Sequence, residues 1–439
     1  MQAAPCPDAG PDVRPDAGPD PGHVARLPAA FDWRPDQPAT LADPFPAYRR
    51  LRDEDPAHYS PHLRAWVLTR YADVRAVLLD PSGMSSDRLR PFFASLADLE
   101  RQRIAEIIRY LSLWMVFTDP PDHTRLRKLT SQVFSVATMN GMRPRIEALV
   151  DRLLGDLEGR ERIDFVADFA GPLPALVIMD MLGVPGSELP MVKALSDRMA
   201  LFIGSARASP EKYAIAEGAT RELAAFFRQT IQARRKQPAD DLITRLIQVR
   251  GATAATNGDR LTDDELVATC ILLLFAGHET TTNHIANGLL SLIKHPDQMA
   301  KLRADRGRAS AAVEELLRHD GPSIAQVRVA AKPWHLHGRT IQPGDRVFLM
   351  LNAANRDERA YPNPDRVDMD RDGPPHLTFG FGMHICLGFP LARLEGQIAL
   401  PEVLAKWPRI ECAVPFEDLE WLDSMVFRGM KALPLVVGR

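Results

Sequence analysis

The sequence has few cysteines and no hydrophobic segment that would direct it into or across a membrane. Only four cysteines occur among its 439 residues, and no two of them form a CxxC pair. This is not a disulfide framework and is typical of a reduced compartment. No apolar run reaches the ~18 residues that a membrane-spanning helix requires. The first residues, MQAAPCPDAGPDVRPDAGPDPG, lack the basic start and apolar stretch of a signal peptide. We expect a cytoplasmic protein with no membrane partner.

An excess of charge of either sign is also lacking. The formal net charge is -3, with 54 Lys and Arg against 57 Asp and Glu. Proteins that bind nucleic acid usually carry a basic excess or a basic patch. The balance therefore predicts no nucleic-acid partner. The hydrophobic share of 45% and the charged share of 25% are those of an ordinary globular protein.

The first 28 residues have too few apolar side chains to form a core. They are rich in Pro, Asp, Gly and Ala, and PDAGPD occurs twice. Such a segment cannot bury enough apolar surface to offset its ordering entropy, so residues 1–28 are predicted to be a disordered tail. No later shift in composition marks a boundary, and residues 29–439 are predicted to form one large domain.

Beyond the tail, helical periodicity dominates and strand signals are short. AWVLT at Ala65 predicts one strand, and the stretch from Val327 to Leu351 predicts several, separated by turns at Gly338 and Gly344. We predict a mainly α fold with a small β part. The helix-like stretches lie near residues 45–53, 71–79, 98–109, 123–133, 142–157, 218–237, 241–249 and 309–318.

The longest predicted helix has clear ends. Thr262 and Glu265 have the spacing of a capping box. Lys294 followed by Pro296 marks the other end, because a cation suits the last turn and proline cannot continue the helix. About 33 residues at ~1.5 Å each make roughly 50 Å. We expect this helix to run through the centre of the protein.

The middle of this helix reads LLLFAGHETTTNH, which raises the question of a zinc site. A zinc peptidase helix carries HExxH, whose two histidines are four apart and share one face. His278 and His284 are six apart, which places them roughly 120° from each other around the helix. We therefore predict no zinc site and interpret both histidines as packing or hydrogen-bonding residues.

The other polar residues of the stretch allow two interpretations. Gly277 costs about 1 kcal/mol relative to Ala inside a helix, so a close approach or a local hydrogen bond is expected there. Glu279 and Thr280 would be costly to bury without partners. They could form a proton relay facing a cavity, or a polar turn facing the surface. This stretch alone does not decide between the two.

Cys386 lies in FGFGMHICLG, among three glycines and just before a helical pattern that starts near Phe389. Glycine permits positive φ and close backbone approach, and the start of a helix favours a thiolate. The loop predicts an anionic sulfur that either ligates a metal or acts as a nucleophile. A nucleophile needs a nearby base, and His384 is poorly placed for that role. Cys270 and Cys412 are interpreted as inert.

FGFGMHICLG resembles the haem-thiolate signature of the cytochrome P-450 superfamily, Phe-x-x-Gly-x-x-x-Cys-x-Gly. The resemblance runs from about residue 40 to the C-terminus and is that of a bacterial-type soluble haem-thiolate monooxygenase. LWMVFTDPPDHTRLR is also similar to self-sufficient, reductase-fused members, so the chain could be the haem domain of such a fusion. The matching motifs are HTRLR (His123, Arg127), AGHETT (Ala276–Thr281), EELLR (Glu315, Arg318), NAANRDERAYPNPDRVD (Asn352–Asp368) and the signature itself (Phe379, Gly382, Cys386, Gly388).

The resemblance implies a haem b with Cys386 as the axial ligand of the iron. A thiolate ligand pushes electron density onto iron and favours cleavage of the O–O bond. By the same resemblance Phe379 packs near the sulfur, Gly388 completes the loop, and Ala276 leaves room for oxygen. The anionic propionates of the haem would be bound by four side chains, namely His123, Arg127, Arg328 and His384.

The resemblance also assigns the polar residues of the central helix. Thr280 would hydrogen-bond dioxygen and Glu279 would relay protons from solvent. The presence of this acid–alcohol pair favours oxygen reduced by electrons over a peroxide-using branch of the family, which typically lacks the pair.

Three charged residues are given a structural role by the resemblance. Glu315 and Arg318 are three apart on one helix face and would form a salt bridge beneath the haem, with Arg366 as the third member. Pro401 lies inside the helical pattern that follows Cys386, and it is expected to bend or break that helix.

The substrate pocket is expected to be apolar. Its bulky aromatic candidates suggest small or flat substrates. The candidate lining residues are Phe92, Phe93, Trp114, Leu273, Ile324, Val426 and Phe427.

The leading hypothesis is a monooxygenase that inserts one oxygen atom from O₂ into a small apolar or aromatic substrate, by hydroxylation or O-dealkylation. Two electrons would come from NAD(P)H through a ferredoxin or a flavin or iron–sulfur reductase, separate or fused. The alternatives are a haem-thiolate peroxygenase, a non-catalytic haem sensor, and a cysteine-nucleophile hydrolase that binds no haem.

Overall fold

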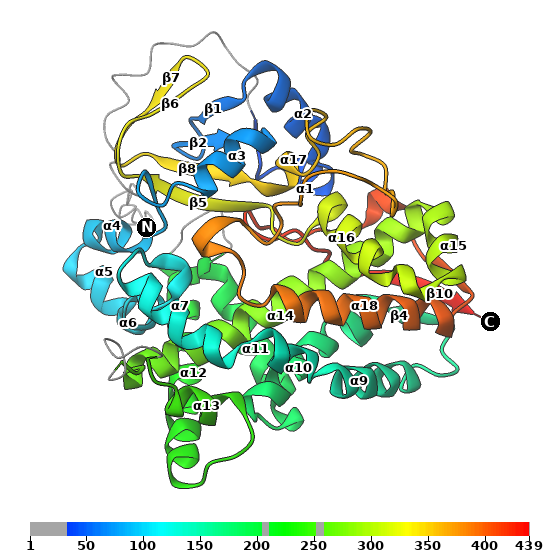
Figure 1. Cartoon of the computed structure of the whole chain (residues 1–439), viewed down its shortest axis with the longest axis horizontal. Helices are drawn as coiled ribbons and strands as arrows, with labels where there is room; N and C mark the ends of the chain where they lie inside the picture. The colour runs from blue at the N-terminus through cyan, green and yellow to red at the C-terminus, as the bar shows by residue number, and fades with distance from the viewer. Residues whose placement is uncertain (1–32, 204–209, 252–258, 439) are drawn as a thin grey trace, which may run out of the picture.

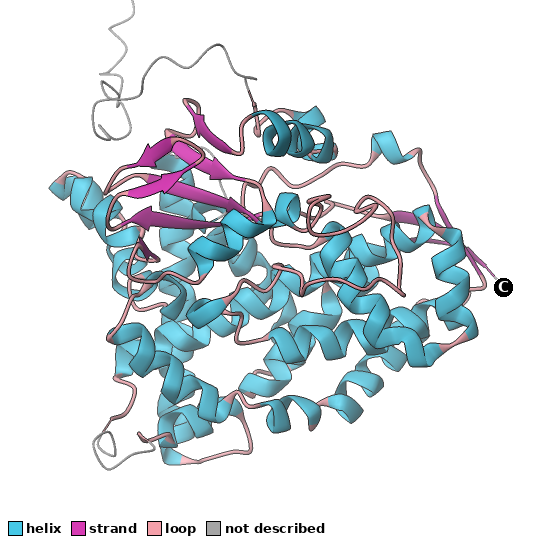
Figure 2. Cartoon of the chain, turned by 45° about the horizontal axis from the view of Figure 1, so that its top comes forward, coloured by secondary structure: helices cyan, strands magenta, loops and turns pink. Residues whose placement is uncertain are grey.

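The computed structural model of the chain describes residues 33–203, 210–251 and 259–438. Helices make up most of the molecule, and the largest sheet lies along one edge of the helical part (Figure 1, Figure 2). The predicted mainly α fold with a small β part is therefore confirmed. The predicted tail, residues 1–28, lies outside the described residues. Within the described part, no helix is both long and apolar enough to cross a membrane.

The helices follow the predicted stretches closely in most places. The stretch predicted over residues 98–109 is instead two helices that meet at Ile104. The described α-helices are α1 (Pro38–Ala42), α2 (Phe45–Glu54), α3 (Tyr71–Leu78), α4 (Leu89–Ser95), α5 (Asp98–Arg103), α6 (Ala105–Leu111), α7 (Asp122–Val133), α8 (Val136–Asn140), α9 (Arg143–Gly155), α10 (Pro172–Leu182), α11 (Leu189–Ile203), α12 (Pro210–Lys236), α13 (Leu242–Gln248), α14 (Asp263–Lys294), α15 (Pro296–Ala304), α16 (Ala309–Asp320), α17 (Leu351–Ala354) and α18 (Phe389–Lys406).

The described strands form three sheets. The largest has the order β1-β2-β8-β5-β3, in which only β2 and β8 run parallel. A second sheet has the order β4-β10-β9, and β6 pairs with β7 alone. The strands are β1 (Ala57–Ser60), β2 (Ala65–Leu68), β3 (Met84–Ser85), β4 (Arg162–Asp164), β5 (Ala325–Ala330), β6 (Trp334–Leu336), β7 (Arg339–Ile341), β8 (Arg346–Met350), β9 (Arg409–Cys412) and β10 (Pro434–Gly438).

Helix α14 has the ends that its sequence predicts. Thr262 Oγ1 accepts from Glu265 N at 3.3 Å, and Glu265 Oε2 accepts from Thr262 N at 2.8 Å, so the capping box is formed. The helix ends at Lys294, and Pro296 begins α15. It contacts α10, α12, α16 and α18 and lies in the middle of the helical part (Figure 1). The prediction of a central helix is confirmed.

Helix α18 begins three residues after Cys386 and packs along α14 and α16. It continues through Pro401, so of the bend or break expected there the break does not occur. Leu400, Pro401 and Val403 are all buried. Packing of this face against the neighbouring helices stabilises the helix despite the backbone hydrogen bond that proline cannot make.

Candidate active site

Four residues in the middle of α14 differ from the rest of that helix. From Glu265 to Leu292 every side chain is buried except at Ala276, Gly277, Glu279 and Thr280, of which Ala276 is the most accessible. Long buried helices expose residues in their middle only where the packing around them opens. The acid and the alcohol that the sequence marks therefore stand at an opening in the packing around α14.

Local contacts explain the glycine and the alcohol at this opening. A Cβ on Gly277 would lie 3.3 Å from Cγ1 of Ile178, so glycine lets α10 pass close to α14. Thr280 Oγ1 donates to the carbonyl oxygen of Ala276 at 2.9 Å. The hydroxyl thus bonds one lone pair of a carbonyl one turn earlier, which leaves its own oxygen able to accept.

Glu279 is placed where its carboxyl holds a proton more tightly than usual. Burial raises the pKa of Glu279, and the neighbouring carboxylate of Asp197 raises it further. Asn283 Nδ2 donates to Glu279 Oε1 at 3.4 Å, and this bond and Lys193 oppose the rise in pKa. Asp197 and Lys193 lie on α11. Glu279 is half-buried and burial dominates its pKa, which favours a relay residue facing a cavity over a surface-facing polar turn.

The two histidines of the stretch are packing residues. Both are buried, and burial lowers the pKa of each to about 4, so both are neutral at pH 7. A Cβ on Gly396 of α18 would lie 2.8 Å from His284 Nε2, so His284 fills the contact between α14 and α18. The described residues contain no group of three or more His, Cys, Asp or Glu that could hold a metal ion.

The Cys386 loop depends on its glycines. Gly380 and Gly382 both have φ of 70°, in the left-handed region that glycine favours. A Cβ on Gly382 would also lie 2.7 Å from the carbonyl oxygen of Leu78. Cys386 N donates to Phe379 O at 2.8 Å and closes the loop.

Two groups of backbone N–H act on the sulfur itself. Burial raises the pKa of the Cys386 thiol, whereas the N–H groups of Gly388 and Phe389 and the nearby Arg127 lower it. Among the described residues no histidine or carboxylate forms a hydrogen bond to this thiol. A nucleophile would lack its base, and the arrangement suits a thiolate that is held for a metal.

Cationic side chains gather beside this loop. The rings of His123 (α7) and His384 lie 4.1 Å apart, and in the described structure His123 Nδ1 and His384 Nε2 are buried without a hydrogen-bond partner. Arg127 Nη1 donates to Ile385 O at 2.6 Å. Burial lowers the pKa of Arg328 (β5) to about 10, partly opposed by Asp119.

The histidines of this cluster are held neutral. Burial is the main cause, and it lowers the pKa of His123 and brings that of His384 to about 3. Arg127 and Arg328 act on both rings in the same direction. The cluster therefore offers two fixed positive charges and two unsatisfied ring nitrogens to an anion.

The comparisons with known proteins decide the family. A profile of the family Cytochrome P450 matches residues 178–408. The chain is 39% identical over 400 residues to Cytochrome P450 107B1 of Saccharopolyspora erythraea, which covers 89% of this chain and 94% of that protein. The chain belongs to the cytochrome P450 family. It is thus an enzyme of the cytochrome P450 monooxygenase family, and haem is the cofactor of that family.

One further sequence and one crystal structure of cytochrome P450 proteins are similar to this chain. The chain is 38% identical over 399 residues to Vitamin D(3) 25-hydroxylase of Pseudonocardia autotrophica, covering 90% of this chain and 94% of that one. The crystal structure of P450BioI in complex with hexadec-9Z-enoic acid ligated Acyl Carrier Protein matches with a TM-score of 0.83 at 33% identity, covering 91% of this chain and 99% of that chain.

The residues present fit a haem. Cys386 presents its sulfur from a glycine loop, and backbone N–H groups temper the charge of a thiolate there. The cluster of His123, Arg127, Arg328 and His384 provides the donors and charges that two propionates would need, and two of its ring nitrogens have no partner among the described residues. Glu279 and Thr280 stand at the opening on α14.

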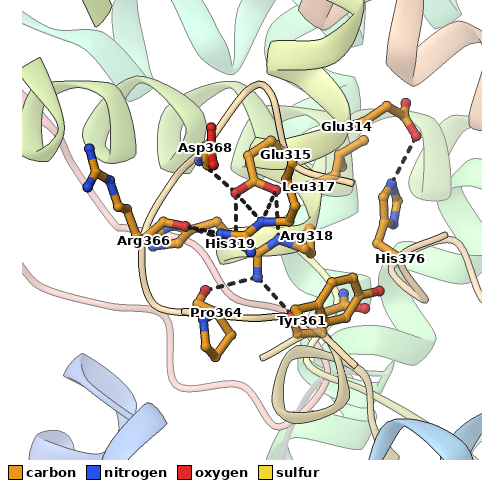
Figure 3. A network of polar contacts seen from close by, with 12 residues as sticks. Glu314, Glu315, Leu317, Arg318, His319, Tyr361, Pro364, Arg366, Asp368 and His376 are labelled. Carbon is orange, nitrogen blue, oxygen red and sulfur yellow. Dashed lines mark hydrogen bonds and ion pairs between the residues drawn. The ribbon is translucent and has the colours of Figure 1, made fainter. Parts of the chain in front are cut away.

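The predicted structural salt bridge of this cytochrome P450 needs one correction. Glu315 and Arg318 are paired as predicted, with Arg318 Nε 2.7 Å from Glu315 Oε2 (Figure 3). The third member is Arg371, whose Nε lies 3.0 Å from Glu315 Oε1. The prediction of Arg366 is wrong, because its exposed side chain pairs with Asp297 and only its carbonyl oxygen accepts from Arg318.

The candidate pocket residues fall into two groups. Trp114 and Phe427 each lie against Phe275 of α14, with ring centroids 5.9 and 6.1 Å apart. Phe92 and Phe93 of α4 lie against Phe202 of α11. The remaining candidates lie near the first group: Leu273 is buried one turn before Gly277 on α14, and Ile324 N donates to Val426 O at 2.8 Å.

The sequence analysis missed several residues that the structure brings to the site. Phe275 and Phe202 belong to helices whose apolar positions could not be told from core. Asp197 and Lys193 lie about 80 residues from Glu279 in the chain, and no local pattern links them to it. Arg371 lies in an irregular segment, where spacing carries no information about which carboxylate it reaches.

Proposed function

We propose that this protein is a haem-thiolate monooxygenase that inserts one oxygen atom from O₂ into an organic substrate with an apolar body. Bound haem would supply the iron at which dioxygen is activated with two electrons. Cys386 would be its axial ligand. His123, Arg127, Arg328 and His384 would hold its propionates. The electrons would come from NAD(P)H through a ferredoxin or a flavin or iron–sulfur reductase.

The observation that carries the proposal is the opening on α14. Glu279 and Thr280 are the acid and the alcohol found there, on a helix that is otherwise buried. Glu279 Oε1 accepts from Asn283, so Oε2 is left to carry the transferable proton. Its raised pKa lets it hold a proton to a higher pH than an ordinary glutamate does. Thr280 Oγ1 would pass that proton to dioxygen, and Asp197 and Lys193 would exchange protons with Glu279 from the α11 side.

The aromatic residues support an apolar substrate. The group around Phe275 adjoins Ala276, the most accessible residue of the opening. The names of two similar proteins mention apolar molecules. One is a vitamin D(3) 25-hydroxylase, and the other was crystallised with hexadec-9Z-enoic acid carried on acyl carrier protein. Both are similarly distant from this chain, so identity alone does not choose a substrate.

Two measurements test the function. The purified protein should carry haem, and its reduced carbon-monoxide form should show the red-shifted Soret band of thiolate ligation. Protein that cannot take up haem, or that lacks this band, would contradict the proposal. NAD(P)H-dependent oxygenation with a surrogate redox partner then separates a monooxygenase from a sensor, which shows no turnover, and from a peroxygenase, which works only with added peroxide.

A further inference from the structure

Arg88 is a cation that the proposed site does not use. It follows β3 and immediately precedes α4. Its side chain is only partly accessible, and burial lowers its pKa to about 10. The charged groups that act on it, Arg328 and Arg346, are both cations. Among the described residues its guanidinium has neither an ion pair nor a hydrogen bond. An arginine placed in this way needs an anion.

The acids near Arg88 in the chain and in space are engaged elsewhere. Asp87 lies 3.0 Å from Nε of Arg90. Asp119 accepts from the hydroxyl of Ser85 and from the backbone N–H of Ser86. Neither carboxylate contacts Arg88. A carboxylate or a similar anion from outside the described chain would therefore meet no competing carboxylate at Arg88.

Arg88 shares this region with other cations. Arg328 and Arg346 lower its pKa further, and Asp119 is the carboxylate that acts on Arg328. Arg127 and Arg328 lie beside the unsatisfied rings of His123 and His384, so they are the arginines placed for the haem.

The guanidinium of Arg88 lies at one end of a row of aromatic rings. Its Cζ is 4.8 Å from the ring centroid of Phe117, which stacks on Trp114 at 5.9 Å with the rings 9° apart. Trp114 in turn lies 5.9 Å from Phe275, which adjoins the opening on α14. The row thus joins a cation at one end to the oxygen-activating residues at the other.

We infer that Arg88 binds the carboxylate of the substrate, and that the substrate is an acid with an apolar or aromatic body. The body would reach from Arg88 toward the opening on α14 while the carboxylate pairs with the guanidinium. This pairing holds the far end of the molecule at the opening beside Ala276 and Thr280. Arginine suits the role, because its planar fork binds a carboxylate through two N–H groups. The inference rests on the proposed function and adds the substrate class.

The test is a spin-state titration of the haem-loaded protein. The probes are tetradecanoic acid and 4-butylbenzoic acid, each compared with its own methyl ester, which has nearly the same shape without the charge. The variants are Arg88→Gln, Arg88→Lys and, as the matched control, Arg90→Gln. Arg90 is two residues away, its side chain is 79% exposed, and it pairs with Asp87.

The expected result is a loss that depends on charge. The wild-type protein binds at least one acid more tightly than its ester. Arg88→Gln weakens that acid roughly 10–100-fold, the scale of one hydrogen-bonded charge pair, and leaves the ester within about twofold. Arg88→Lys falls between the two, because it keeps the charge and loses the fork. Arg90→Gln behaves as wild type.

Several results would overturn the inference. Esters that bind as tightly as acids, or no binding of either acid, would exclude an acid site. Equal weakening of acid and ester by Arg88→Gln would mean a change of shape rather than of charge. Faster loss of haem to apomyoglobin, without selective loss of the acid, would make Arg88 a propionate ligand instead. A failure of the proposed function is distinct from all of these, because it appears as a missing thiolate band or as no NAD(P)H-dependent turnover.

Discussion

Thr280 and Thr282 stand two residues apart on α14 and form the same kind of local hydrogen bond. Thr280 Oγ1 donates to Ala276 O at 2.9 Å, and Thr282 Oγ1 donates to His278 O at 3.0 Å. Thr282 is buried, whereas Thr280 is at the opening. Comparing the two therefore distinguishes the hydroxyl of Thr280, which can act at the opening, from that of Thr282, which only bonds a backbone carbonyl.

The first prediction concerns this pair. Thr280→Ala removes the hydroxyl that would hand protons to dioxygen, so product formed per NAD(P)H should fall by about tenfold or more, with the electrons appearing as hydrogen peroxide. The measurement is the ratio of product to NAD(P)H and peroxide, with a reductase in excess. Thr282→Ala loses the same local bond and should keep wild-type coupling. Unchanged coupling in Thr280→Ala would contradict the relay.

The second prediction concerns the pKa of Glu279. A carboxyl with a raised pKa is protonated at low pH and loses its proton as pH rises through that pKa, so proton delivery and turnover should decline on the alkaline side. Asp197→Asn removes a neighbouring negative charge, lowers the pKa of Glu279, and should move this decline to lower pH. Glu279→Gln should reduce turnover and remove the decline.

The pH profile of kcat checks this prediction. Asp180 of α10 is a surface carboxylate 3.1 Å from Arg145, and Asp180→Asn should leave the profile in place. A decline that stays at the same pH in Asp197→Asn would show that another group controls it.

At the scale of elements, the meander between α17 and the Cys386 loop is held to α16 by buried arginines. Arg318 bonds Glu315 and also the carbonyl oxygens of Asn355, Pro364 and Arg366. Arg371 reaches the same carboxylate from the far side of the meander. One glutamate thus fixes a long irregular segment, and with it the approach to the cysteine loop.

The third prediction follows from the burial of these arginines. Arg371 and Glu315 have side-chain accessibilities of 10% and 6%, whereas Arg366 and Asp297 have 65% and 51%. Arg371→Gln removes one of the two guanidinium groups that bond the buried carboxylate of Glu315 and should lower the free energy of unfolding by about 1–3 kcal/mol. Arg366→Gln should change it by less than about 1 kcal/mol. Urea unfolding of both variants is the measurement. Equal losses of unfolding free energy would show that the side chain of Arg366 stabilises the fold as much as that of Arg371 does, contrary to the prediction.

At the scale of the whole molecule, the carboxyl group of Glu395, on α18, is buried in the protein and has no role in the proposed site. Glu395 is 1% exposed, and its Oε2 has no hydrogen-bond partner in the described part of the chain. Burial raises the pKa of Glu395 well above its ordinary value. The folded protein therefore keeps this proton to a higher pH than the unfolded chain, whose carboxyl titrates at about 4.3.

The fourth prediction is the consequence of this burial for stability. Since the folded state binds the extra proton, the contribution of Glu395 is fully present below about pH 4.3 and is lost as pH rises towards the folded-state pKa. Glu395→Gln cannot ionise, so its free energy of unfolding should fall less than that of wild type as pH rises above about 4.3. Glu402→Gln is the control, because Glu402 is on the same helix and pairs with Arg306 at 2.6 Å. Parallel pH curves for Glu395→Gln and wild type would contradict the prediction.

The sequence by itself determined the elements whose cause is local. The capping box at Thr262, the stop at Pro296 and the apolar periodicity between them are sufficient for α14, because each depends on residues within a few positions of one another. The glycines around Cys386 are informative for the same reason. The resemblance of that loop to the cytochrome P-450 signature identified the family before any contact was known.

Only the tertiary structure decided which distant groups meet. Arg371, rather than Arg366, reaches Glu315, and Asp197 of α11 acts on the pKa of Glu279. Pro401 remains helical because its neighbours pack around it. Arg88 differs from Arg90 only in what surrounds it. Burial, pKa and partner choice depend on contacts across the chain, and the spacing of residues along a sequence carries no information about them.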